Sequence, residues 1–289
     1  MFLTVLDVSI SGLLMGGIYA LIAMGLSIQY GVARVLNVSH GEFIMFGAFC
    51  TWWLHAVLGL NPFLAMIISG PVIFACGYGL HRTLFTSLRK SSENMGAYEG
   101  ISLLASFGLM FIVQNVALLI WGADPQGYTF MAQPASIFGA IFTANRLMAL
   151  VFAVTISLVF YLFLMHTRLG EAIRAAALNP DVAQLMGVNI HFVLALCFGC
   201  GAMLAGFAGS LISMIFEITP TMGMEYTIIA IIVVVLGGLG SITGSLIGGF
   251  ILGLIGSIVT YVNPELSLIA YYIIFMLLIL VKPTGILGK

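Results

Sequence analysis

The sequence has very little charge. Only 7% of its 289 residues are Asp, Glu, Lys or Arg, whereas 62% are hydrophobic, and the mean hydropathy is +1.19. A soluble domain carries roughly 25% charged residues, so this chain cannot cover a globular surface with polar groups. Nine Lys and Arg against ten Asp and Glu leave a net charge of −1, without the basic surplus that binding nucleic-acid phosphates requires. These scarcities exclude a soluble enzyme and a nucleic-acid-binding protein, and they indicate an integral membrane protein.

Motifs for catalysis and for nucleotide or metal binding are missing as well. There is no Ser/His/Asp set and no His-Glu-x-x-His helix, and the glycine-rich GGLGS lacks the Lys of a P-loop. The cysteine pair Cys197 and Cys200 lies in an apolar run without further ligands, which favours packing over metal or redox chemistry. We therefore expect this chain to bind no metal or cofactor of its own. Asp7 is the first charge, so the opening apolar stretch reads as a retained helix rather than a cleaved signal.

Long apolar runs predict an all-α polytopic membrane protein with a single domain over residues 1–289. At about 20 apolar residues per transmembrane helix the chain fits roughly eight to ten spans, which would face membrane lipid. A membrane β-barrel would instead show short alternating segments. The second span and the pair on either side of Gly244 could be broken or re-entrant. The expected spans are Val8–Ile28, Val38–Leu58, Phe63–Leu84, Ile101–Trp121, Leu147–Met165, Ile190–Ser213, Tyr226–Thr243, Ser245–Tyr261 and Leu266–Val281.

The Lys and Arg residues predict the orientation, because short loops rich in them stay in the cytoplasm. Nine spans place the N-terminus outside a bacterial inner membrane and the C-terminus in the cytoplasm. Arg146 is an exception, since it falls outside. The cytoplasmic basic residues are then Arg34, Arg82, Arg89, Lys90, Arg168, Arg174, Lys282 and Lys289.

Two connections stand out by their length. The residues from Gly122 to Arg146 hold two prolines and two charges, and we expect an external cap or docking surface there. Residues 168–189 predict a short helical hairpin on the cytoplasmic face. Its alanines favour helix, Asn179 can cap a second helix with Pro180 at its first position, and Gly187 can end it.

Small residues recur every four positions, as in Gly12 and Gly16, in Gly240, Gly244 and Gly248, and in Gly249 and Gly253. In lipid this spacing lets helix backbones approach closely, so tight packing is the favoured interpretation. A hinge or a lining of a transport path at Gly240 and Gly244 is compatible with it.

One polar cluster, NVSHGEF at residues 37–43, interrupts the apolar sequence, with Gln29 upstream. His40 and Glu42 are two apart, so on a helix they point to different sides and form no acid/base pair. We favour a position at the cytoplasmic interface. The alternative is a path or gate formed by Gln29, Asn37, His40, Glu42, Gly240 and Gly244.

Glu217 and Glu225 flank a short segment that we place at the outer face. Solvated loop acids are the ordinary interpretation. The alternative is that these two residues, with Asp124, dock a periplasmic partner.

Without a nucleotide motif, a transporter needs either an ion gradient or a separate ATPase. Ion coupling usually leaves acids or histidines deep in several spans, and those are lacking here. An ATPase needs a rigid cytoplasmic element to push, and the predicted hairpin suits that role. An ion-coupled transporter or channel remains the alternative, and a polytopic membrane enzyme is poorly supported.

Several of these segments resemble the ABC-importer permeases for branched-chain amino acids. The stretch from Gly16 to Phe49 is similar to the opening of one permease of that family's unequal pair. The segments Val234–Gly249 and KPTGILG at 282–288 match its later motifs, although Lys282 and Leu287 stand where Arg and Phe are expected. The resemblance therefore covers essentially the whole chain.

The resemblance implies a permease that acts with a homologous second permease, two cytoplasmic ATPases that bind ATP and Mg, and a periplasmic or extracellular solute-binding protein. The solute would be a branched-chain amino acid or a related small solute such as urea, an amide or an aromatic acid. The hairpin would then be the coupling helix. The residues expected to couple it to the ATPase are Arg168, Gly170, Glu171, Arg174, Ala175, Asn179, Pro180, Asp181 and Gly187.

Overall fold

The computed structural model describes residues 2–137, 140–282 and 284–287. Within them eight helices are long and apolar enough to cross a membrane, and α10 is apolar but shorter. Gly288 and Lys289, which the sequence places in the C-terminal motif and the cytoplasmic tail, lie outside the described residues. The chain is thus an all-α polytopic membrane protein, as predicted.

Each of the expected spans has a helix as its main element. These helices are α1 Phe2–Ala33, α2 His40–Leu58, α3 Pro62–Leu80, α5 Met95–Trp121, α6 Ala144–His166, α9 Ile190–Ser213, the shorter α10 Met222–Gly237, α11 Ile242–Val262 and α12 Ser267–Val281. The shorter elements are η1 His81–Phe85, α4 Thr86–Ser91, β1 Pro134–Ile137, β2 Ala140–Thr143, α7 Arg168–Leu178, α8 Pro180–Leu185 and η2 Pro264–Leu266.

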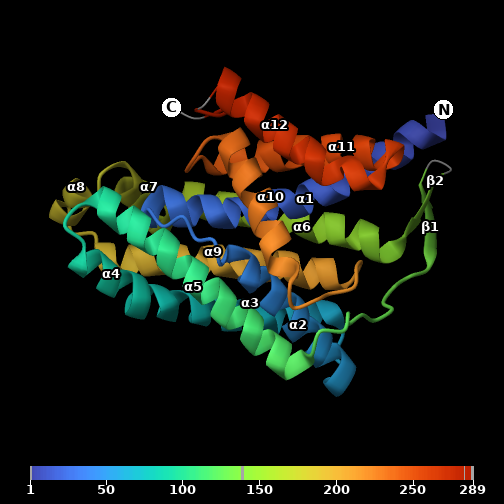
Figure 1. Ribbon diagram of the computed structural model, residues 1–289, viewed down its shortest axis with the longest axis horizontal. Helices are drawn as coiled ribbons and strands as arrows, with labels where there is room; N and C mark the ends of the chain where they lie inside the picture. Colours follow the sequence, from blue (N-terminus) through green and yellow to red (C-terminus); the bar gives the residue numbers. More distant parts are fainter. Residues whose placement is uncertain (1, 138–139, 283, 288–289) are drawn as a thin grey trace.

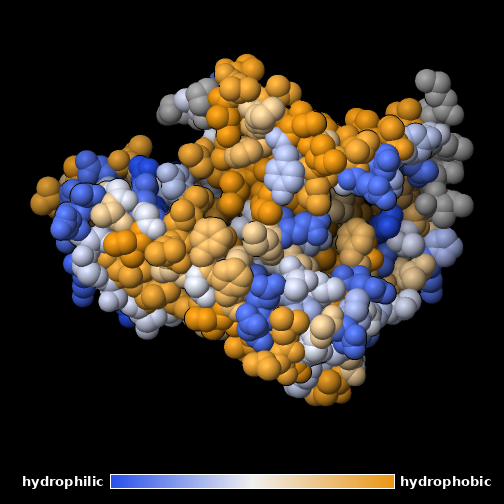
Figure 2. Space-filling model, viewed as in Figure 1, coloured by the Kyte–Doolittle hydropathy of each residue, from blue (hydrophilic) through white to orange (hydrophobic). Residues whose placement is uncertain are grey.

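In Figure 1, α1, α6 and α9 follow the long axis of the molecule, whereas α10 runs steeply across them. The hairpin of α7 and α8 lies at one end, which we call the hairpin end. The N-terminus and the two strands lie at the other, which we call the strand end. Figure 2 shows apolar side chains over much of the visible face, with polar side chains at the two ends and a smaller polar area near the centre. This distribution fits a protein whose middle zone faces lipid.

The helical hairpin forms as its sequence predicts, because both helices are capped locally. Asn179 Oδ1 accepts hydrogen bonds from the main-chain N–H groups of Asp181 and Val182, at 3.1 and 3.2 Å. Thr167, a cap that the sequence interpretation missed, accepts one at 3.0 Å from Gly170. Gly187 ends α8 with a φ of 88°, in the left-handed region that favours glycine.

The seventh and eighth expected spans need a correction, because their boundary at Gly244 is wrong. Helix α10 ends at Gly237, and α11 begins at Ile242. Gly238 and Gly240 have φ values of 104° and 78°, which an α-helix cannot contain. The C-terminal tail closes this break, since Ile286 N–H donates to the carbonyl oxygen of Leu236 at 2.8 Å.

The longest connection forms a small sheet as part of the expected external cap. β1 and β2 pair antiparallel, with Pro134 opposite Thr143. An isolated bridge then joins Gln126 to Ile218, with N···O distances of 2.9 and 2.8 Å. The loop is therefore fastened to the segment that precedes α10.

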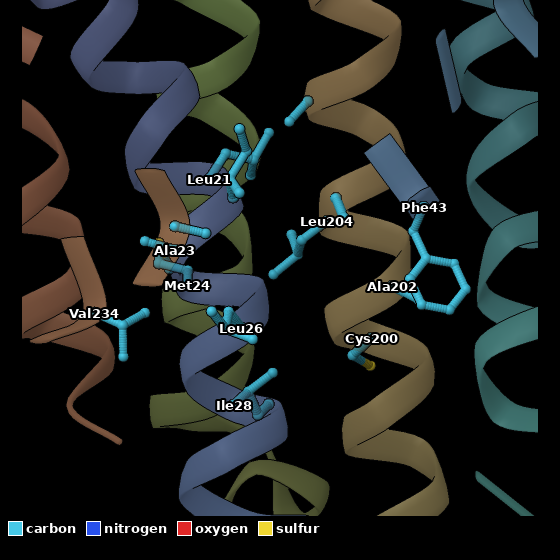
Figure 3. Packing of buried hydrophobic residues seen from close by; sticks show 14 of the residues in the cluster. Leu21, Ala23, Met24, Leu26, Ile28, Phe43, Cys200, Ala202, Leu204 and Val234 are labelled. Atoms are coloured by element: carbon cyan, nitrogen blue, oxygen red, sulfur yellow. The ribbon is translucent and has the colours of Figure 1, made fainter. Parts of the chain in front are cut away.

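Glycine contacts hold α1 against α11, as the four-residue spacing predicts. A Cβ added at Gly16 would lie 2.8 Å from the Cα atom of Phe250, and one at Gly253 would overlap the backbone of Gly16. On its other side α1 faces α9, the most buried of the spanning helices. Figure 3 shows Leu204 of α9 directed towards α1, while Phe43 lies beside Ala202.

Helix α2 begins inside the bundle rather than at its end. From Arg34, at a φ of 55°, a non-helical segment turns back along α1 to Ser39. Side chains of other helices satisfy its main chain: Val38 N–H donates to Ser106 Oγ and its carbonyl accepts from Thr227 Oγ1, both at 3.1 Å. Non-helical backbone is tolerated within a membrane protein where it is buried in protein and satisfied in this way. The second span itself is one continuous helix, His40–Leu58, and the non-helical backbone lies in the segment before it.

Candidate functional site

Three buried polar side chains from α1 and the non-helical segment form a hydrogen-bonded chain. Ser39 Oγ donates to Asn37 Oδ1 at 2.6 Å, and Asn37 Nδ2 donates to Gln29 Oε1 at 3.2 Å. Gln29 Nε2 then donates to the carbonyl oxygen of Phe198 in α9, at 3.1 Å. The structure therefore brings the predicted path residues Gln29 and Asn37 together, in a network that ties α1 to α9.

His40 and Glu42 lie next to this network, where α2 and α10 begin. His40 is fully buried, and its Nε2 donates to the carbonyl oxygen of Ile22, near the middle of α1, at 3.1 Å. The interpretation that places these residues at the cytoplasmic interface is therefore wrong. That interpretation assumed a helix entering from the bundle end, whereas the non-helical segment carries them inward. The expectation that acids and histidines are lacking deep in the spans is therefore wrong at these two residues.

The first turns of α2 and α10 meet at two glycines. Gly41 N–H donates to Thr227 Oγ1 at 2.8 Å, and a side chain at Gly41 would overlap the carbonyl of Gly223. Glu42 is only 3% exposed, and its Oε1 lies 2.5 Å from where a Cβ on Gly223 would stand. Its other oxygen, Oε2, has no hydrogen-bond partner among the described residues. Burial of a carboxyl group within a membrane protein is costly, although the first turn of α2 favours an acidic residue, and this makes Glu42 a candidate site residue.

The two predicted path glycines lie elsewhere and pack against backbone. Gly240 meets Gly31 near the end of α1, with 3.1 Å between an added Cβ and the Gly31 Cα. Gly244 packs on the carbonyl of Gly237 across the turn between α10 and α11. This geometry supports the packing interpretation, and a role in the path stays a prediction.

A groove opens beside Glu42 between α2, α3 and α5. Its volume is about 570 Å³, and apolar side chains make up most of its wall. Ser39 and Glu42 are polar residues of that wall. A second cavity of about 570 Å³ lies between α1, α10, α11 and α12, and its lining includes Asp7, Arg146 and Glu225.

The three acidic docking candidates do not form one cluster. Asp124 and Glu217 lie on the two segments that the Gln126–Ile218 bridge joins, and both are exposed. Glu225 lies on α10 and lines the second cavity instead. Burial raises the pKa of the nearby Tyr128 hydroxyl, bonded to Ser213 at 3.1 Å, to about 12. The strand end thus carries a loop that hydrogen bonds hold to the end of α9 and the segment after it, with Asp124 and Glu217 as exposed acidic residues.

At the hairpin end, the Arg174 side chain is directed towards the end of α6. Its guanidinium group donates a hydrogen bond to the carbonyl oxygen of Leu164, near the end of α6. Gly170 is buried, and a side chain there would overlap Leu164. These two candidates fasten the hairpin to α6. The exposed coupling candidates are Arg168, Glu171, Ala175, Asn179, Asp181 and Gly187, and Pro180 is half-buried.

The sequence interpretation missed the apolar residues of the hairpin. Leu178, Leu185 and Met186 are 88%, 86% and 81% exposed, and Val182 is also exposed. From the sequence alone, apolar residues in a polar segment are expected to be buried. Only the fold shows that they project outward.

Comparison with known proteins completes the description of the site. The family model for the branched-chain amino acid transport system permease component matches residues 8–281. The chain belongs to this permease family. The family consists of membrane permeases of ABC transporters.

Curated relatives of the permease match over nearly their whole length. The high-affinity branched-chain amino acid transport system permease protein LivH of Salmonella typhimurium is 31% identical, over 100% of this chain and 97% of the relative. The corresponding protein BraD of Pseudomonas aeruginosa is 31% identical, over 97% and 94%. The ribose import permease protein RbsC of Escherichia coli is 30% identical, but over only 53% and 51%.

A solved structure shares the fold of the permease. PsaBC from Streptococcus pneumoniae, in complex with Fab, aligns with a TM-score of 0.51 at 14% identity. The alignment covers 95% of this chain and 91% of that one. At this identity the likeness concerns the fold alone.

Proposed function

We propose that the permease is the membrane subunit of an ABC importer that takes up branched-chain amino acids or a related small amphipathic solute. Separate ATPase subunits, which hold ATP and Mg, would supply the energy. The observation that carries the proposal is the row of exposed apolar side chains on the α7–α8 hairpin, Leu178, Val182, Leu185 and Met186. An exposed apolar patch on a polar element outside the membrane spans is typical of a protein-docking surface.

The attachments of the hairpin to the bundle would transmit the movement of a docked ATPase to the spanning helices. Its α7 buries Gly170, Ile173 and Ala176 against the spans, and α8 is capped directly onto the end of α7 by Asn179. Arg174 fastens α7 to α6, and Val188 N–H bonds the Ala183 carbonyl at 3.1 Å just before α9. Movement of a docked ATPase would therefore reach α6 and α9 together.

The remaining partners follow from the proposed function. A homologous second permease would complete the membrane unit, and a periplasmic or extracellular binding protein would deliver the solute at the strand end. The exposed Asp124 and Glu217 lie there, at the joined segments. The hairpin end would face the cytoplasm, with the N-terminus outside the cell and the C-terminus inside.

The test is ATP-dependent uptake of L-leucine by vesicles that hold the complete transporter. The variant Leu185→Asp puts a charge into the apolar row and should lower uptake about tenfold, the equivalent of 1.4 kcal/mol of docking energy. The control Gln184→Asp adds the same charge one residue away without removing an apolar group, and should change uptake far less. Both variants should reach the membrane in normal amounts.

Two results would overturn the proposal. Normal ATP-driven uptake by both single variants, Leu185→Asp and Leu178→Asp, would show that the hairpin is not the docking element. Uptake driven by an ion gradient, by the chain reconstituted without any ATPase, would support the ion-coupled transporter or channel instead.

A further inference from the structure

A single carboxyl group lies in the wall of the apolar groove between α2, α3 and α5. Glu42 is 97% removed from contact with solvent, as its exposed fraction is 3%, and it lines the groove with Ser39. Its Oε2 has no hydrogen-bond partner among the described residues. An acid held inside a membrane protein without a partner is expensive, and such acids are candidate positions in substrate or ion pathways.

The surrounding fold holds this acid in place without giving its Oε2 atom a hydrogen-bond partner among the described residues. Gly41 and Gly223 pack their backbones together beside Glu42, so neither position offers a side chain that could bond the carboxyl group. His40, two residues away, directs its Nε2 to the carbonyl of Ile22. The remaining polar groups of the segment bond one another, through Ser39, Asn37 and Gln29.

The rest of the groove has the opposite chemistry. Phe43, Met45 and Phe46 of α2 line it, as do Leu80 of α3 and a row of aliphatic residues of α5. Its volume of about 570 Å³ falls within the roughly 300–1,000 Å³ that pockets for small molecules occupy. The groove therefore offers aliphatic contacts over most of its wall and one carboxyl group that can pair with a positively charged hydrogen-bond donor.

We propose that the groove is a binding site for the transported solute, in which Glu42 binds an α-ammonium group and the apolar wall binds a branched aliphatic side chain. The inference rests on the proposed function and deepens it, because it assigns the residue that recognises the amino group. A lipid acyl chain would pack against the apolar wall of the groove but would leave the carboxyl group of Glu42 without a cation. A helix of the second permease, as the occupant of the groove, would need a Lys or Arg beside Glu42 to pair with its carboxyl group.

The carboxyl group can be observed directly in the complete transporter. Dicyclohexylcarbodiimide is an apolar reagent that attaches to carboxyl groups, and mass spectrometry locates the label. We expect label at Glu42, none at that position in Glu42→Gln, and unchanged labelling of Glu42 in the control Glu265→Gln, which alters an exposed acid between α11 and α12.

Three ligands with related carbon skeletons then separate the contributions. L-Leucine and 3-methylbutylamine, which both carry the ammonium group, should lower labelling of Glu42 about fivefold or more at saturation. The analogue 4-methylpentanoate, which lacks the amino group, should not protect. In Glu42→Asp, which keeps a shorter carboxyl group, protection should need a higher leucine concentration.

Several outcomes would overturn the inference. Equal protection by 4-methylpentanoate would mean that the groove binds apolar molecules without recognising the amino group. Labelling that is blocked in lipid bilayers but restored in detergent would show an acyl chain in the groove. Labelling blocked only when the second permease is present would show a helix there.

The failure of this inference and of the proposed function are distinguishable. If Glu42→Gln takes up leucine normally and in an ATP-dependent way, the importer stands and the site is wrong. If wild-type uptake does not depend on the ATPases, the proposed function itself fails, whatever the labelling shows.

Discussion

Arg174 on α7 donates a hydrogen bond from its guanidinium group to the main-chain carbonyl oxygen of Leu164, ten residues earlier in the chain. The bond joins an element outside the spans to the end of a spanning helix. A hydrogen bond to a charged group contributes about 1.5–3 kcal/mol, which is enough to keep so short a helix in one orientation. The hairpin therefore moves with α6.

Replacing Arg174 by Glu should uncouple the hairpin from the bundle. The carboxylate cannot donate to the Leu164 carbonyl and repels it, so we expect ATP-dependent uptake to fall about tenfold or more. Membrane insertion, measured as the amount of folded chain in the membrane, should not change. Arg174→Lys keeps a donor and should retain more uptake than Arg174→Glu, and equal activity of the two variants would contradict the prediction.

The contact between α1 and α11 should not tolerate a side chain at Gly249. A Cβ there would overlap the backbone of Ala20, so Gly249→Val forces the helices apart and should cost about 1–3 kcal/mol of unfolding free energy. Thermal unfolding in detergent, followed by circular dichroism, measures the effect. Gly108→Val on α5 is the matched control, because a Cβ at Gly108 meets nothing within 4 Å. Equal stability of the two variants would argue against the close approach.

The C-terminal tail should stabilise the end of α10. Gly285 has a φ of 79°, and a Cβ there would lie 2.5 Å from the Gly238 nitrogen. Gly285→Val should therefore release the tail, and with it the bond from Ile286 to Leu236. Hydrogen exchange at the last turn of α10 should become faster. The neighbouring Thr284→Val serves as control, and protection lost equally in both variants would count against the assigned role.

Removing the amide of Gln29 should destabilise the bundle core. Gln29→Leu leaves the Phe198 carbonyl and the Asn37 amide unsatisfied in a buried place, which costs about 1–3 kcal/mol for each group left without a partner. Asn115→Leu is the control, because Asn115 is exposed and bonds only the Phe111 carbonyl of its own helix. A fall in unfolding temperature is expected for the first variant alone.

Local rules explain what the sequence could predict. The hairpin follows from its caps, since Asn179 bonds N–H groups only two and three residues away. Helix packing through Gly12, Gly16, Gly249 and Gly253 follows from spacing alone, because a four-residue repeat places small residues on one face. In both cases the information lies within a few residues of the feature.

The sequence could not predict the positions of residues that depend on contacts with residues far along the chain. His40 and Glu42 lie inside the bundle because residues 34–39 leave the helical conformation, and side chains of α5 and α10 bond the main chain of Val38. The short sheet and the Gln126–Ile218 bridge likewise need partners far along the chain. The outward direction of Leu185 and Met186 depends on which side of the hairpin the spans occupy.

The bonds that Val38 forms have a consequence for biosynthesis. Its partners Ser106 and Thr227 lie 68 and 189 residues later in the chain. The segment before α2 leaves the ribosome long before these hydroxyl groups exist, and its bare amides cannot rest in hydrocarbon meanwhile. The two hydrogen bonds of Val38 can therefore form only after α10 has been made, so the start of α2 acquires its complete set of native contacts late in synthesis.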